Sequence, residues 1–70
     1  MEKIIITGCN LKHYMGLKKL SFVDISDATG ISVRSIKRYI TDGTIPSLDN
    51  ALTICNFLGA TLNQIWPSEK

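Results

Sequence analysis

The chain has 70 residues, enough for one small domain, and its hydrophobic content of 44% and charged content of 20% indicate a globular protein rather than a disordered or fibrous one. Its longest apolar run, the three isoleucines at 4–6, is far too short for a membrane helix or a signal peptide. The net charge of +2 only weakly indicates an anionic partner, and the two isolated cysteines, Cys9 and Cys55, predict neither a disulfide framework nor a zinc site.

The first helix is predicted to begin after Asn10, a residue type that favours the N-cap position. Leu11, Tyr14 and Met15 follow at the spacing of one helix face and form its apolar stripe. Gly16 is expected to weaken the end of this helix.

A helix-turn-helix is predicted in the middle of the chain. Ser21 and Asp24 have the spacing of a capping box that opens a second helix, and Gly30 ends that helix. The apolar face of this second helix consists of Phe22, Ile25, Ala28 and Thr29. Ser32 can cap a third helix over residues 33–40, so two short helices are joined by about three residues that include a glycine.

Two further helices are predicted near the C-terminus. Ser47 can cap a fourth helix, Gly59 suits its C-terminal end, and Thr61 with Gln64 has the spacing of a capping box for a short fifth helix that Pro67 closes. The apolar face of the fourth helix consists of Leu48, Ala51, Leu52, Ile54, Cys55 and Leu58, and the fifth helix carries Leu62, Ile65 and Trp66.

The third predicted helix is divided into a cationic and an apolar side. At 3.6 residues per turn, Arg34, Lys37 and Arg38 lie together, opposite Ile36 and Ile40. Such a face is often only a solvated surface. The helix dipole does not favour cations near a helix N-terminus, however, and this end of the second helix of a helix-turn-helix is the one that enters the DNA major groove. The pattern therefore favours a target rich in phosphates and guanine acceptors.

Most of the chain is made up of three stretches, "NLKHYM", "LSFVDISDATGISVRSIKRY" and "IPSLDNALTICNFLGATLNQIWP". Together they resemble the Cro and phage-repressor type of helix-turn-helix, the XRE family. The resemblance implies an all-α, compact five-helix lambda-repressor-like domain over residues 10–67, with the helix-turn-helix at helices two and three. Residues 1–9 are then an N-terminal arm and 68–70 a C-terminal tail. The arm is expected to fray, to pack on its own domain, or to pair with the arm of a second copy.

The resemblance also implies a function and a set of contacts. We expect a sequence-specific regulator of transcription, a repressor or Cro-like switch, which binds a palindromic operator in double-stranded DNA as a homodimer. The positions that face bases are Val33, Arg34 and Arg38. The positions that face bases or phosphates are Ser32, Ser35 and Lys37. The positions near phosphates are Phe22, where family members often carry a glutamine, and Thr41 and Thr44, although Gly43 lies one residue later than the usual loop glycine.

The sequence also predicts a dimer contact and the absence of a catalytic site. Ile54, Phe57 and Trp66 are candidates for a dimer contact, because exposed aromatic residues mark interfaces. No catalytic constellation, metal-ligand cluster or phosphate-binding loop is present in the sequence. We therefore expect a cytoplasmic protein that is not an enzyme, with no cofactor, no small-molecule ligand and no membrane partner.

Two alternatives remain open at this stage. The stretch "SIKRYITDGTIPS" also resembles the recognition helix of the winged MerR and excisionase proteins, which bend DNA, and this alternative expects a β-wing after residue 43. The other alternative is a protein-interaction module of antitoxin or antirepressor type. It would use Phe57, Trp66 and the isoleucines at 4–6 as its contact surface.

Overall fold

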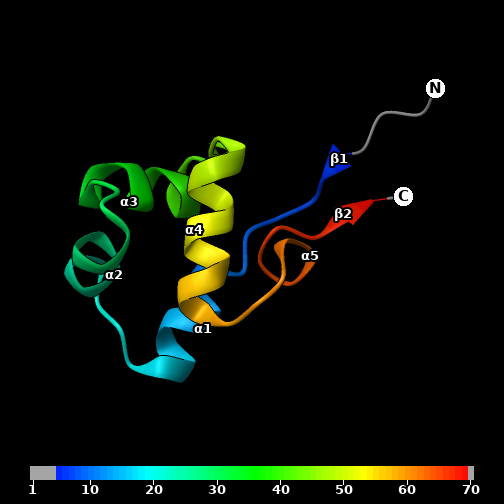
Figure 1. The fold of residues 1–70 in the computed structure, drawn as a ribbon. Coiled ribbons are helices and arrows are strands. Elements are labelled where there is room, and N and C mark those ends of the chain that lie inside the picture. Colours follow the sequence, from blue (N-terminus) through cyan, green and yellow to red (C-terminus); the bar gives the residue numbers. More distant parts are fainter. Residues whose placement is uncertain (1–4, 70) are drawn as a thin grey trace.

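The computed structural model describes residues 5–69, in which five helices come between two short strands along the chain, and the two strands lie side by side (Figure 1). In chain order the elements are β1 (Ile5–Ile6), α1 (Leu11–Lys18), α2 (Phe22–Thr29), α3 (Val33–Thr41), α4 (Leu48–Leu58), α5 (Leu62–Ile65) and β2 (Ser68–Glu69). The predicted five-helix, all-α domain is confirmed, with a two-stranded pairing added at its ends. None of the described helices is both long and apolar enough to cross a lipid bilayer.

Both predicted capping boxes are confirmed. At the start of α2, the Ser21 hydroxyl accepts the Asp24 N–H at 3.1 Å, and the Asp24 carboxylate accepts the Ser21 N–H at 2.9 Å. At the start of α5, Thr61 and Gln64 make the same reciprocal pair at 3.2 and 2.9 Å. Each box satisfies two N–H groups that have no partner within the helix.

Two other predicted caps differ from expectation. Asn10 has φ −97° and ψ 15°, outside the extended region of a typical N-cap, and its side-chain amide instead donates to the Gln64 carbonyl at 3.0 Å. Ser47 has N-cap backbone angles, but its hydroxyl donates to the Asp49 carboxylate at 2.6 Å rather than capping α4. The oxygen of that hydroxyl accepts no N–H group of α4.

The end of α1 lies beyond Gly16. The helix runs through Gly16 and ends at Lys18, and Lys19 adopts the left-handed conformation at φ 56°. Lys19 is the one non-glycine residue with a positive φ in the part of the chain that the structure describes. The turn is held by the N–H of Leu20, which donates to the Met15 carbonyl at 2.9 Å.

The core is assembled around α4, which lies in the middle of the helices in Figure 1. α2 packs against both α3 and α4, and α4 packs against α5. The fully buried side chains are Leu11, Ile25, Ile36, Ile54, Leu58 and Ile65. Leu48 and Leu52, by contrast, are exposed, so the apolar face predicted for α4 is wider than the surface that its neighbours cover.

The N-terminal arm lies beside the C-terminal end of the same chain. Ile5 pairs with Glu69 and Ile6 with Ser68 in antiparallel register, and the Thr7 N–H donates to the Pro67 carbonyl at 2.8 Å. Of the three arrangements considered for this segment, packing on its own domain is the one that residues 5–9 adopt. Figure 1 shows β1 and β2 on the side of the domain away from α2 and α3. Residues 1–4 of the expected arm and residue 70 of the expected tail lie outside the described residues.

Candidate nucleic-acid interface

The turn between α2 and α3 is fixed by local hydrogen bonds. Gly30 has φ 77°, a left-handed conformation that favours glycine, and its N–H donates to the Ser26 carbonyl at 2.9 Å. The Thr29 hydroxyl donates to the Ile25 carbonyl at 2.7 Å and accepts the N–H of Ile31 at 3.3 Å. Ile31 is buried, so the turn is anchored in the core and α3 leaves it in a defined direction.

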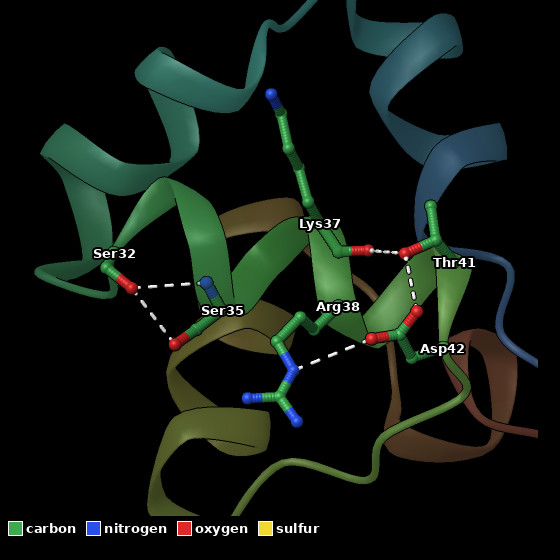
Figure 2. Close-up of polar contacts among 6 residues, drawn as sticks. All are labelled: Ser32, Ser35, Lys37, Arg38, Thr41 and Asp42. Carbon is green, nitrogen blue, oxygen red and sulfur yellow. Dashed lines mark hydrogen bonds and ion pairs between the residues drawn. The ribbon is translucent and has the colours of Figure 1, made fainter.

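The first turn of α3 uses two of the residues expected to contact DNA. The Ser32 hydroxyl accepts the Ser35 N–H at 3.1 Å and donates to the Ser35 hydroxyl at 3.0 Å (Figure 2). Ser32 is therefore the N-cap of α3, as the sequence predicts. Ser35 keeps its own hydroxyl hydrogen for another acceptor.

The burial of α3 follows the predicted division into two sides. Ile36 is fully buried and Tyr39 is buried, whereas Ile40 is only half-buried. Arg34, Lys37 and Arg38 are exposed, and Val33 is half-buried at the start of the helix. The core thus holds one side of α3, and the other side presents three cations to solvent.

One of these cations has an acidic neighbour. The Nε atom of Arg38 lies 3.6 Å from the Oδ2 atom of Asp42, and the two side chains are 56% and 58% exposed (Figure 2). An ion pair this exposed contributes little to stability. This pair was not predicted, although its i, i+4 spacing on a helix indicates it. Arg34 has no side-chain hydrogen bond or ion pair with any residue of 5–68.

Thr41 and Thr44 follow the cations at the end of α3. The Thr41 hydroxyl donates to the Lys37 carbonyl at 2.9 Å and also lies 3.2 Å from the Asp42 carboxylate. A phosphate contact by this hydroxyl therefore requires it to leave its intrahelical acceptor. Thr44 is half-buried, and its backbone N–H lies 3.4 Å from the Arg38 carbonyl.

Phe22, the first residue of α2, lies beneath a cation of α3. The ammonium of Lys37 is 5.4 Å from the centroid of the Phe22 ring, within the distance of a cation–π interaction. A phenylalanine has no polar group to offer a phosphate. At the position where a phosphate contact was expected, Phe22 therefore has only a ring, and this ring contacts Lys37.

Two of the three residues considered for a dimer contact are not on the surface. The side chain of Ile54 is 0% exposed and that of Trp66 is 6% exposed, because both belong to the core between α4 and α5. This corrects the expectation for these two residues. Phe57 is 40% exposed and stays available for a contact with another molecule.

The remaining reactive groups are two thiols. Burial raises the pKa of Cys9, and the Leu11 N–H and the Trp66 indole lower it by less. Burial also raises the pKa of Cys55. Both are therefore protonated, weakly nucleophilic thiols at neutral pH.

The Trp66 indole nitrogen is buried without a hydrogen bond of good geometry to any described residue. Among the side chains of residues 5–68, no three His, Cys, Asp or Glu gather as a metal site requires.

The comparison with protein families agrees with this geometry. A family model described as helix-turn-helix matches residues 11–65, from the first residue of α1 to the last residue of α5. No curated protein in the comparison matches the chain. After Gly43 the described chain forms a loop and then α4, where the winged alternative expects strands.

Proposed function

Because the chain belongs to the helix-turn-helix family, of the Cro and phage-repressor (XRE) type, we propose that it controls transcription by inserting α3 into the major groove of an operator. The family is one of DNA-binding regulators rather than of enzymes, and the chain is such a regulator. The observation that carries the proposal is the exposed cationic side of α3, opposite the buried Ile36 and Tyr39.

In the proposed complex, the residues of α3 have different tasks. Arg34 and Arg38 donate to guanine O6 and N7, and the methyl groups of Val33 contact a thymine methyl. Lys37 reaches a phosphate, and its counterion release makes binding depend on salt. Ser35 donates its free hydroxyl hydrogen to a base or phosphate, while Ser32 positions it. Thr44 lies at the adjoining loop, near the backbone of one strand.

The proposed assembly is a homodimer on a palindromic operator, with half-sites about 34 Å apart. Two exposed apolar surfaces support dimerisation. One is Phe57, on the C-terminal half of α4. The other is a hollow of about 380 Å³ whose rim includes the exposed side chains of Ile6, Ile45, Leu48 and Leu62 and no charged residue. By occupying promoter DNA, such a dimer acts as a repressor or Cro-like switch.

The uncharged hollow equally suits the alternative of a protein-interaction module. Salt dependence separates the two functions. A DNA regulator that contacts several phosphates loses affinity steeply as salt rises, whereas a module that only touches DNA weakly shows little salt dependence.

The test of the proposed function is selection of bound sequences from a random pool of DNA duplexes. We expect an enriched palindromic sequence whose half-site spacing is close to one helical turn. Sedimentation of the wild type, with Phe57→Ser and Leu48→Ser as variants, then reports whether the chain dimerises and through which surface. A pool with no enriched sequence, or affinity that does not respond to salt, contradicts the proposal.

A further inference from the structure

An acidic residue at the end of a DNA-binding helix needs an explanation. Asp42 is the C-cap of α3, and a carboxylate there is opposed by the negative end of the helix dipole. Asp42 also lies next to Thr41 and Thr44, the residues expected near phosphates, where a negative charge repels DNA. Neither helix stability nor attraction to DNA therefore accounts for an acid at this position.

The contacts of Asp42 offer an explanation for an acid at this position. Its Oδ2 atom lies 3.6 Å from Arg38 Nε, and its Oδ1 atom lies 3.2 Å from the Thr41 hydroxyl, which is itself fixed by the Lys37 carbonyl at 2.9 Å. The carboxylate thus lies between Arg38 and the Thr41 hydroxyl, whose single hydrogen is shared with the Lys37 carbonyl. Figure 2 shows the Nε edge of Arg38 turned towards Asp42, with the two terminal nitrogens pointing away from it.

From this geometry we infer that Asp42 is a specificity-determining residue that positions the guanidinium of Arg38 for base recognition. An arginine held through Nε still has both terminal nitrogens free, and these donors match the O6 and N7 acceptors of guanine. The pair is exposed and weak in the free protein. It becomes stronger when DNA excludes water from it, because the local dielectric constant falls. The inference rests on the proposed function, since it assigns Asp42 a part in the same base contact.

Arg34 provides an internal comparison. No hydrogen bond or ion pair with a described side chain orients the Arg34 guanidinium before DNA arrives. We therefore expect that Asp42 influences base preference only at the base pair beneath Arg38. The base pair beneath Arg34 should be read equally well with or without the carboxylate.

Asp42→Asn tests the inference, because it keeps the size of the side chain and removes its charge. The best duplex from the random pool is compared with duplexes changed at one base pair and with a random duplex. We expect discrimination at the Arg38 base pair to fall by at least ~3-fold, a part of the ~5- to 150-fold that a bidentate arginine–guanine contact supplies. Affinity for the random duplex should rise, because a negative charge is lost. A purely structural role would lower both affinities and the melting temperature.

Two controls make the result specific. Asp27→Asn removes the same charge from the exposed surface of α2 and should leave discrimination at the Arg38 base pair unchanged. In an Arg38→Ala background, Asp42→Asn should have no further effect on discrimination. If the wild type enriches a sequence and Asp42→Asn discriminates as well as the wild type, the inference is overturned and the proposed function stands. If the wild type enriches nothing, the proposed function fails and the inference fails with it.

Discussion

The ammonium of Lys37 lies 5.4 Å from the centre of the Phe22 ring, so a cation of α3 rests on the first residue of α2. This contact crosses the turn of the helix-turn-helix and limits the directions in which Lys37 can point. It also gives Phe22 a task that needs no polar group. In the proposed complex, Phe22 acts on the phosphate backbone through Lys37 rather than by its own contact.

Phe22→Leu is expected to weaken binding to all duplexes by up to about 5-fold, because Lys37 loses a cation–π contact of about 0.5–1 kcal/mol that orients it towards the phosphates. The loss should be the same for operator and random DNA, since Lys37 is assigned to phosphates. Phe22→Tyr keeps the ring and serves as the matched control, with affinity close to that of the wild type. Equal affinities for the leucine and tyrosine variants in a fluorescence-anisotropy titration would count against the contact.

Arg34→Ala is expected to cost about 1–3 kcal/mol at the operator and to relax the preference at one base pair in each half-site. Arg34 makes no hydrogen bond or ion pair with the side chains that the structure describes, so the substitution breaks no such interaction of the free protein. Lys37→Ala is the comparison, because it should mainly reduce the salt dependence by about one counterion without changing base preference. An operator footprint that is the same for the wild type and Arg34→Ala would contradict the assignment.

The features that the sequence predicted correctly depend on residues close together in the chain. The capping boxes at Ser21 and Thr61 involve residues three positions apart, so their spacing is sufficient. Asn10 holds the predicted N-cap position before α1, but its side chain does not cap the helix and its amide donates to Gln64, a residue 54 positions later. No local pattern contains that information.

The same distinction applies to the candidate site. The two sides of α3 follow from helical periodicity, and the Arg38–Asp42 pair has the i, i+4 spacing that sequence can indicate. The Phe22–Lys37 contact joins two helices and depends on the angle between them, which periodicity does not define. Ile54 was expected at a dimer contact because a helical wheel identifies an apolar residue without showing which neighbour covers it.

Lys19→Gly is expected to stabilise the domain by up to about 1 kcal/mol. Lys19 occupies the left-handed region at φ 56°, where a side chain is disfavoured and glycine is not. Lys18→Gly is the matched control, because Lys18 is in the regular part of α1, and there glycine should destabilise by about 1 kcal/mol. The two free energies of unfolding, from urea titrations, should change in opposite directions. A loss of stability in both variants would contradict the role given to the backbone at Lys19.

Acid should destabilise the protein partly through Asp49, at the start of α4. The Ser47 hydroxyl, which donates to this carboxylate at 2.6 Å, is the main cause that lowers the pKa of Asp49, and the Asn50 N–H adds to it. Because the folded state favours the ionised form, the contribution is present above the pKa of the unfolded chain, about 3.9 for Asp. It is lost as the pH falls through the lower pKa of the folded state.

The expected result is a wild-type melting temperature that falls between about pH 5 and pH 3, with a smaller fall for Asp49→Asn, because that variant has no proton to bind at this site. Ser47→Ala should also reduce the pH dependence, since it removes the main hydrogen-bond donor while leaving the acid in place. Thermal unfolding followed by circular dichroism across this range measures all three proteins. Parallel curves for the wild type and both variants would show that the Ser47–Asp49 hydrogen bond has no part in acid unfolding, and the loss would then come from other carboxylates.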